Sequence, residues 1–369
     1  MTESSDLTAP ELREKLEKGE QVAVYDVRRA QDREWTIPGA IGLDIHDQLW
    51  ANDPKALDGV NLPRDRQVLF VCGRGNTSLL AANLAREHGI PAASLYGGMK
   101  AWSPQWNLAD VPANGAHAEV IQVRRTGKGC LSYVVGSRGQ AAVIDASVDP
   151  KVYLDIASRR GWKIAHVIDT HVHADHVSRA RPLAQAAGTA VSLPEQKRVR
   201  SPFTPLKDGE TLKIGSAGLE VSATPGHTFE SVSLLLDCKV LFTGDTLFLS
   251  TVGRPDLAAR VDDETRERAR LLYASVHRIM KLPGDTLVLP GHHASPVEFD
   301  HKPVTAKLAD VIRDASVLSM KEGEFVDAVL AHLPQPPANH LKIVAANEAG
   351  EFPPETADLE VGGNRCAVK

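Results

Sequence analysis

The sequence predicts two domains of different class, an α/β domain followed by an α+β domain. The chain has 369 residues, which at about 100–200 residues per domain corresponds to two domains. Up to residue 106, apolar strand-like runs alternate with helical patterns, which favours a mostly parallel sheet covered on both faces. After residue 117 the strand-like runs come in pairs between helices, which favours mixed sheets sandwiched by helices.

The alternation in the first domain rests on four segments. We expect helices over 11–18 and 78–88, and buried strands over 21–25 and 67–71. The segment 108–117 is small and polar, with no apolar periodicity, which is typical of a linker. We therefore place the first domain at 1–108, the linker at 109–117 and the second domain, with a C-terminal helix and tail, at 118–369.

The second domain begins with a predicted hairpin whose turn is Ser137-Arg138-Gly139. Strands are expected over 130–136, 140–145, 165–168, 212–214, 219–223, 232–236 and 240–243. Helices are expected over 150–160, 179–187, 262–280 and 304–315. The segment from about residue 334 has several prolines and little pattern, so we expect it to lie over the surface of this domain.

Composition excludes several classes of protein. A net charge of −5 without long runs of one sign argues against a nucleic-acid or anionic-membrane surface. No apolar run approaches the roughly 18 residues of a membrane span, and the polar N-terminus lacks the pattern of a signal peptide. The four cysteines are far apart, which argues against a disulfide framework. We therefore predict a cytoplasmic protein without nucleic-acid or membrane partners.

A glycine-containing loop with a cysteine joins the strand over 67–71 to the following helix. Cys72 opens this loop, so its sulfur lies among inward-pointing N–H groups at the positive end of a helix dipole. Both effects lower the pKa of a thiol and favour an anionic sulfur. The loop therefore predicts a reactive thiol that holds a thiolate or a persulfide, rather than a structural cysteine.

Residues 6–106 resemble the rhodanese family of sulfurtransferases. The resemblance rests on Asp26-Val27-Arg28, Ile37-Pro38-Gly39-Ala40, the Cys72 loop and residues 95–102, which occur in the family's order. It implies that Cys72 is the catalytic residue that carries sulfane sulfur. It also implies that the loop binds this sulfur through Gly73, Arg74, Gly75, Asn76, Thr77 and Ser78. Thr36 replaces the histidine of many members, but it lies outside the loop.

Four fragments of the second domain each place a potential metal ligand just after a strand. In residues 169–176, three imidazoles and the carboxylate of Asp175 share one tight loop. The other three fragments carry His227, Asp245 and His292. A lone histidine is more often an ordinary core or surface residue, but four such fragments in order predict a transition-metal centre.

Residues 118–300 resemble the metallo-β-lactamase fold, an αββα sandwich with its metal site at one sheet edge. The superfamily includes hydrolases such as glyoxalase II, with two metals, and persulfide dioxygenases, with one iron. The closer resemblance is to the dioxygenases, some of which are fused to rhodanese domains. It rests on residues 129–133, 244–247, 252–256 and 363–368. One departure is His293-Ala294, where those dioxygenases usually have Asp-Tyr; we assign no role to His293 or Cys366.

Two ligand sets are compatible with these residues. One iron would use two histidines and one carboxylate on one face, namely His171, His227 and Asp245, and would leave positions open for O₂ and a persulfide. The surrounding residues would then orient the ligands: His173, Asp175, His176 and His292. A dinuclear hydrolase would instead bind one ion with His171, His173 and His227. Its second ion would use Asp175, His176 and His292, with Asp245 bridging. The residue types present are compatible with both ligand sets, and the resemblance to the dioxygenases favours one iron.

The sequence thus predicts an enzyme with one Fe(II) per chain. This enzyme would use O₂ to oxidise a low-molecular-weight persulfide, expected to be glutathione persulfide, and would release sulfite. Its first domain would transfer sulfane sulfur through a persulfide on Cys72. The alternative is a dinuclear zinc thioesterase similar to glyoxalase II, with an accessory rhodanese domain. Arg254 is a candidate ligand for a substrate carboxylate. The expected partners are a small thiol or persulfide, O₂, and thiosulfate or sulfite; a homodimer is also compatible with the sequence.

Overall fold

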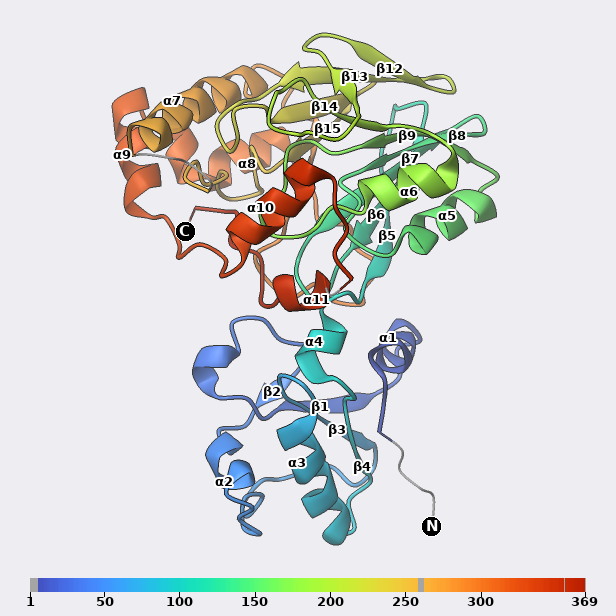
Figure 1. Ribbon diagram of the computed structural model, residues 1–369, viewed down its shortest axis with the longest axis vertical. Coiled ribbons are helices and arrows are strands. Elements are labelled where there is room, and N and C mark those ends of the chain that lie inside the picture. The colour runs from blue at the N-terminus through green and yellow to red at the C-terminus, as the bar shows by residue number, and fades with distance from the viewer. Residues whose placement is uncertain (1–5, 258–261, 355, 369) are drawn as a thin grey trace.

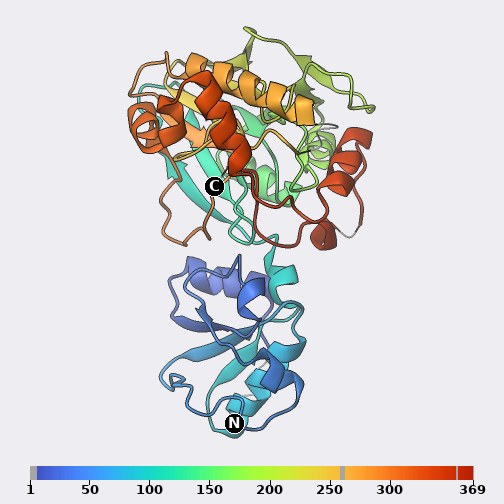
Figure 2. The same cartoon turned by 90° about the vertical axis from the view of Figure 1, so that its left-hand side faces the viewer.

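The computed structural model describes residues 6–257, 262–354 and 356–368, which form two domains stacked along the long axis of the molecule (Figure 1). A view turned by 90° shows the same narrow junction between them (Figure 2). The predicted fold class is confirmed, because a parallel-sheet α/β domain is followed by an αββα sandwich. In the described part of the chain, no helix is long and apolar enough to cross a membrane.

The first domain is built on a four-stranded sheet with the order β2-β1-β3-β4, in which every pair is parallel. Its strands are β1 (Val22–Asp26), β2 (Ile41–Gly42), β3 (Gln67–Val71) and β4 (Ala92–Ser94). Its helices are α1 (Ala9–Glu17), α2 (His46–Trp50), α3 (Asn76–Glu87) and α4 (Gly98–Trp102). Alternate residues of β3 pack on opposite faces, with Phe70 in the core beside α3, and Leu69 and Val71 in the core beside Trp102.

Two mixed sheets form the centre of the second domain. The seven-stranded sheet has the order β11-β10-β9-β8-β7-β6-β5, from β5 (Asn107–Val111), β6 (Glu119–Arg124), β7 (Leu131–Ser137), β8 (Gln140–Ile144), β9 (Lys163–Ile168), β10 (Val191–Pro194) and β11 (Thr204–Leu206). The six-stranded sheet runs in order from β12 (Thr211–Ile214) through β13 (Ala217–Ala223), β14 (Val232–Leu236), β15 (Val240–Gly244) and β16 (Leu287–Pro290) to β17 (Ala306–Lys307). In the predicted hairpin, Arg138 and Gly139 both have positive φ, as a tight β7–β8 turn requires.

Helices cover the outer face of each sheet. On the seven-stranded sheet lie α5 (Pro150–Arg159) and α6 (Ala180–Ala187). On the six-stranded sheet lie α7 (Asp262–Ile279), α8 (Leu308–Asp314) and α9 (Glu322–Ala331). An apolar cluster lies between each sheet and its helices. A third apolar cluster, with Tyr133 and Phe242 in edge-to-face contact, fills the space between the sheets. Burial of these three clusters stabilises the sandwich.

The structure differs from the expected chain organisation at three places. The linker expected over 109–117 begins inside β5, whose five residues pair antiparallel with β6, so residues 109–111 belong to the second domain's sheet. The proline-containing tail forms two further helices, α10 (His340–Ala349) and α11 (Thr356–Leu359). The helix expected over 304–315 is also shorter, because residues 306–307 pair with β16 as a strand.

Trp35 of the first domain packs at the interface between the two domains. The side chain is 4% exposed, and its indole N–H donates to the Thr126 carbonyl at 2.9 Å. A Cβ atom at Gly129 or Gly363 would come within 2.6 or 2.8 Å of the indole ring, so both positions require glycine. Phe299 adds an apolar contact with Trp102. The domains are therefore held in a defined orientation by packing.

The C-terminal segment after α10 contacts both domains. Its helix α11 lies against α4 of the first domain (Figure 1). Its residue Glu360 is fully buried in the second domain, where its carboxylate accepts from Arg125 at 2.6 Å and from Arg179 at 2.5 Å. Burial opposes ionisation of Glu360, but the two guanidinium groups lower its pKa from 4.5 to about 2. This anchor fixes the segment on the second domain.

We expect Glu360→Gln to destabilise the second domain by about 3–5 kcal/mol, because it leaves two buried guanidinium groups without their counter-ion. Urea unfolding followed by circular dichroism measures the loss. In the parent, the contribution of Glu360 to the free energy of unfolding should be lost as the pH falls from about 4.5 to about 2, because a carboxylate with a lowered pKa stabilises the fold only while it is ionised. An unchanged midpoint in Glu360→Gln would contradict the anchor.

Candidate metal centre and thiol site

The predicted metal ligands lie on loops that follow β9, β13, β15 and β16. Glycines allow these loops to approach one another. A Cβ atom at Gly291 would lie 2.6 Å from Asp245 Oδ1, and one at Gly244, whose φ is 48°, would lie 2.5 Å from Thr170 Oγ1. The loops thereby bury all seven predicted ligands: His171, His173, Asp175, His176, His227, Asp245 and His292.

His171, His227 and Asp245 form one compact group. Asp245 Oδ2 lies 3.7 Å from His171 Nε2 and 3.6 Å from His227 Nε2. Both His171 Nε2 and Asp245 Oδ2 are buried without a hydrogen-bond partner among the described residues. Buried polar atoms are rarely left unpaired in proteins. Two imidazoles and one carboxylate that face a common point therefore fit a transition-metal ion.

Hydrogen bonds on the far side of each ring fix which nitrogen faces this point. His227 Nδ1 lies 2.8 Å from the Arg254 carbonyl, which can only accept, so Nδ1 carries the proton. Thr170 Oγ1 donates to Asp145 at 2.9 Å and thus accepts from His171 Nδ1 at 3.0 Å. Each Nε2 therefore presents a lone pair to the centre of the group, as a metal ligand must.

Electrostatics favour the same protonation states. Burial lowers the pKa of His227, and burial together with His173 lowers that of His171, so both rings are neutral at pH 7. Burial alone would raise the pKa of Asp245, but the contact with His292 outweighs it and holds the pKa well below its usual value. The group thus offers two neutral donors and one anion.

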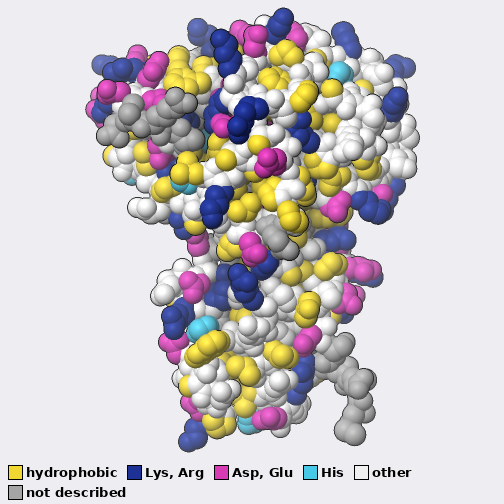
Figure 3. Space-filling view, viewed as in Figure 1, with side chains coloured by type: hydrophobic (Ala, Val, Ile, Leu, Met, Phe, Trp, Pro, Cys, Tyr) yellow, Lys and Arg dark blue, Asp and Glu magenta, His cyan; other side chains and the backbone are white. Residues whose placement is uncertain are grey.

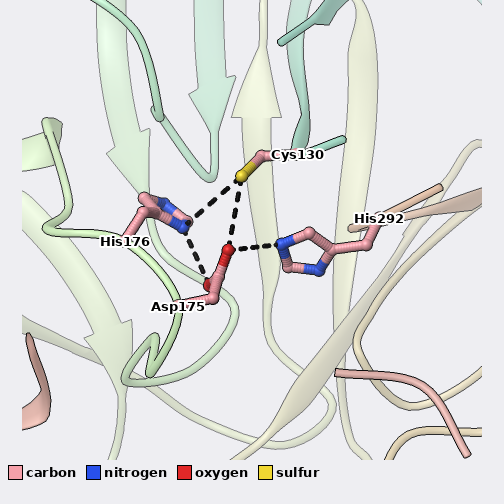
Figure 4. Close-up of side chains that lie close together, drawn as sticks. All are labelled: Cys130, Asp175, His176 and His292. Carbon is pink, nitrogen blue, oxygen red and sulfur yellow. Dashed lines mark hydrogen bonds and ion pairs between the residues drawn. The ribbon is translucent and has the colours of Figure 1, made fainter. Parts of the chain in front are cut away.

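His292 lies between two carboxylates and contacts both of them. Its Nδ1 lies 2.7 Å from Asp245 Oδ1, and its Nε2 lies 2.9 Å from Asp175 Oδ2. Asp175 Oδ1 in turn lies 2.9 Å from His176 Nδ1. Figure 4 shows this second group, which also includes Cys130. Because both ring nitrogens of His292 meet carboxylates, this ring orients Asp245 and Asp175 toward each other.

His173 is separate from both groups. Its Nε2 points to Asp145 Oδ1 at 3.3 Å and to Asp169 Oδ1 at 3.7 Å. Its ring still packs near His171, with centroids 4.3 Å apart. The first ion of the dinuclear hypothesis requires His171, His173 and His227 together, and the structure does not place His173 Nε2 with the other two.

The sequence missed the polar setting of Cys130. Cys130 begins the strand predicted over 130–136, and its Sγ lies 3.3 Å from Asp175 Oδ2 and 3.9 Å from His176 Nδ1. Burial and Asp175 raise the pKa of Cys130, but His176 and His292 outweigh them and lower it to about 7. Nothing local in the sequence marks this contact, because β7 and the loop after β9 meet only in the folded domain.

Arg254 does not fit the substrate-binding role predicted for it. Its guanidinium is fully buried and forms a two-point contact with Asp256 at 2.7 Å. Its backbone carbonyl instead orients His227, and its backbone N–H donates to the Cys366 carbonyl at 2.9 Å. Through this contact the tail places the buried Cys366 thiol beside Asp245 and His292.

The thiol site of the first domain lies where β3 meets α3. Cys72 Sγ accepts from the Gly75 N–H at 3.1 Å and from the Ser78 hydroxyl at 3.3 Å. Burial raises the pKa of Cys72, but hydrogen bonds from Ser78, Thr77 and two loop N–H groups outweigh it, so the pKa is lowered. Of the six predicted loop residues, Gly73, Arg74 and Asn76 are exposed, whereas Gly75 is half-buried and Thr77 and Ser78 are buried.

Comparison with known families divides the chain in the same way. Residues 8–105 match the rhodanese-like domain. Residues 125–197 and 190–292 match the metallo-beta-lactamase superfamily. These matches cover the Cys72 loop and every predicted metal ligand.

Three known proteins illustrate the similarity. A hydroxyacylglutathione hydrolase of Brucella ovis is 35% identical over 156 residues, which is 41% of this chain; the chain spans 56% of that relative's length. A metallo-beta-lactamase structure from Staphylococcus aureus superposes with a TM-score of 0.58 and 25% identity, over 64% of this chain and 73% of its own. ETHE1 from Myxococcus xanthus gives a TM-score of 0.54 and 27% identity, over 63% of this chain and 98% of its own.

Proposed function

The chain consists of a rhodanese-like domain followed by a metallo-β-lactamase domain, and from this premise we propose that it is a one-iron persulfide dioxygenase coupled to a sulfurtransferase. The substrate of the metal centre would be a low-molecular-weight persulfide such as glutathione persulfide. The sulfurtransferase would use Cys72. The similarity to ETHE1 over 98% of that chain supports the comparison of the whole second domain.

The observation that carries the one-metal proposal is the separation of the histidines. His171 and His227 share Asp245, whereas His173 Nε2 is directed at Asp145 and Asp169. His292, which a second ion would need, already uses both ring nitrogens in contacts with Asp245 and Asp175. A second ion at the dinuclear position would have to displace these contacts. Two histidines and one carboxylate remain, which is the ligand set of non-haem iron oxygenases.

An iron ion held by His171, His227 and Asp245 would supply O₂ activation at its open coordination positions. Other residues of the chain would hold the three ligands in the orientation that metal binding requires. The Arg254 carbonyl and Thr170 hold the two rings with Nε2 inward, and His292 fixes Asp245 through a 2.7 Å hydrogen bond. Such supporting contacts preserve ligand orientation and charge.

The proposed overall reaction balances in atoms and electrons. A persulfide RSSH, O₂ and H₂O give the thiol RSH, sulfite and two protons; the outer sulfur loses four electrons, which reduce O₂. The first domain would supply the persulfide. Thiosulfate transfers its outer sulfur to the Cys72 thiolate and leaves as sulfite, and a thiol then accepts that sulfur. The lowered pKa of Cys72 favours the thiolate that both steps need.

The rival function is a dinuclear zinc thioesterase. It is favoured by the similarity to the Brucella ovis hydroxyacylglutathione hydrolase, which covers 41% of this chain. All residues that such a site needs are present and buried. It would require a ring nitrogen of His173 to join those of His171 and His227, with which the structure does not group it.

We expect the purified protein to consume O₂ when it receives glutathione persulfide and to release one sulfite per O₂, with little hydrolysis of S-lactoylglutathione. The reason is that His171, His227 and Asp245 form the only one of the two proposed first-ion sets that is assembled. An oxygen electrode, a sulfite assay and thioester absorbance measure the three rates. Rapid thioester hydrolysis without O₂ uptake would reverse the assignment.

A further inference from the structure

A cavity of about 500 Å³ lies between the two domains and reaches Cys72. One wall is the Cys72 loop with Arg74 and Lys100 from the first domain. The other wall comes from the second domain and includes Val361, Gly362 and Arg365 of the C-terminal segment. The thiol site is therefore incomplete without the second domain, although its loop geometry belongs wholly to the first.

The second-domain wall is held in place from both ends. Glu360, next to Val361, is anchored by Arg125 and Arg179 in the interior of the second domain. Gly363 packs against the Trp35 ring. Arg365 reaches across to the first domain, where its guanidinium donates to both Glu34 oxygens at 3.0 and 2.5 Å. A wall fixed in this way is pre-organised for a ligand.

The charge of the cavity indicates an anionic ligand. Four cationic side chains line it, Arg28, Arg74, Lys100 and Arg365, together with the carboxylates of Asp32 and Glu34. Arg28 is paired with Asp26 at 2.5 Å and Lys100 with Asp358 at 2.8 Å, so the guanidinium groups that can turn toward a ligand are those of Arg74 and Arg365. Figure 3 shows Lys and Arg side chains gathered with Asp and Glu at the waist between the domains. Arg74 is 71% exposed and only 3.5 Å from Asp358, an exposed pair that contributes little and leaves the guanidinium able to turn toward a ligand.

The donors of Arg365 remain partly available. A guanidinium has five N–H donors. Glu34 takes two, and the Gln335 carbonyl takes one at 3.4 Å. The side chain is 33% exposed, so its remaining donors can reach a carboxylate in the cavity.

The size of the cavity indicates more than an inorganic ion. Cavities of about 300–1,000 Å³ bury small organic molecules. Thiosulfate and cyanide, with five and two non-hydrogen atoms, would fill only a small part of 500 Å³. A peptide-sized thiol with carboxylates matches both the volume and the guanidinium groups of Arg74 and Arg365.

We propose that the C-terminal segment of the second domain completes the Cys72 site as a binding site for a carboxylate-bearing low-molecular-weight thiol, with Arg365 as a binding residue that selects this acceptor. This inference rests on the proposed sulfurtransferase function and names its acceptor site. The acceptor thiolate attacks the outer sulfur of the Cys72 persulfide. A new S–S bond forms to the acceptor, the bond to Cys72 Sγ breaks, and Cys72 leaves as a thiolate. The acceptor departs as a persulfide, without any external oxidant.

The test measures discharge of Cys72 in the full chain. The protein is loaded with thiosulfate, desalted and mixed with glutathione, which carries two carboxylates, or with cysteamine, which carries none. Alkylation and mass spectrometry of the Cys72 peptide follow persulfide loss. In Arg365→Ala, we expect the rate constant for glutathione to fall about tenfold or more, as loss of one charge-assisted hydrogen bond predicts. The rate constant for cysteamine should change less than twofold.

Glu34→Gln is the matched control, because it weakens the same contact between the domains but keeps the Arg365 cation. It should discharge to glutathione faster than the parent, because it removes a carboxylate that competes with the ligand for Arg365. Arg313→Ala, at an exposed arginine on α8, should match the parent. Equal slowing with both thiols, an unchanged glutathione rate in Arg365→Ala, or a glutathione rate in Glu34→Gln that is not raised would each overturn the inference. A parent that thiosulfate does not load at Cys72 would overturn the sulfurtransferase function itself.

Discussion

Asp245→Ala should lose both its bound metal and its persulfide-dependent O₂ uptake. Asp245 Oδ2 faces His171 and His227 at 3.7 and 3.6 Å and is the sole anion of that group. Its removal leaves two neutral imidazoles to hold a dication, and it also frees His292 from one of its two carboxylate contacts. Inductively coupled plasma mass spectrometry of protein purified without added metal gives the metal content per chain.

Asp175→Ala is the matched comparison, since Asp175 is an equally buried carboxylate that contacts the same His292. If one iron is bound, Asp175 only orients other groups, and its loss should cost about 10–100-fold in affinity or activity without removing the metal site. In a dinuclear site Asp175 would be a ligand. A parent with two metals that falls to one in Asp175→Ala would therefore refute the one-iron proposal.

The parts of the fold that could be predicted from sequence are those specified by local patterns. The strand over 67–71 and the hairpin around Arg138 and Gly139 are marked by apolar runs and by turn residues. The metal ligands were equally visible, because each follows a strand within a few residues. The choice of His171, His227 and Asp245 as one group, however, rested on the family resemblance, because the residue types present were compatible with both ligand sets.

The features that escaped prediction depend on contacts between distant segments. Cys130 approaches Asp175 across 45 positions, and Glu360 meets Arg125 across 235. A buried ion pair leaves no periodicity in the sequence, and a carboxylate in a proline-containing tail resembles any solvated residue. Arg254 illustrates the opposite error: a loop arginine suggested a substrate ligand, yet its backbone orients His227 and its side chain is buried on Asp256.

Cys72→Ser should abolish sulfur transfer from thiosulfate to cyanide. The loop supplies Gly75 and Ser78 donors that stabilise an anionic sulfur, and the lowered pKa of Cys72 provides the thiolate that attacks thiosulfate. A serine hydroxyl in the same place remains protonated and cannot carry sulfane sulfur. O₂ uptake with added glutathione persulfide should persist, because the metal centre lies in a separate domain with its own core. Cyanide-dependent thiocyanate formation and O₂ consumption measure the two activities on one preparation.

Two companion variants distinguish loss of the Cys72 thiol from loss of the hydrogen bonds around it. Cys238→Ser removes an exposed cysteine and should leave thiocyanate formation unchanged. Ser78→Ala keeps the Cys72 thiol but removes the hydroxyl that donates to Sγ at 3.3 Å. Loss of that donor raises the pKa of Cys72, so the rising limb of the pH–rate profile should move to higher pH while the rate at high pH is largely kept. Parent-like transfer in Cys72→Ser would disprove the role of Cys72, and an unmoved profile in Ser78→Ala would show that the loop does not set the reactivity of its sulfur.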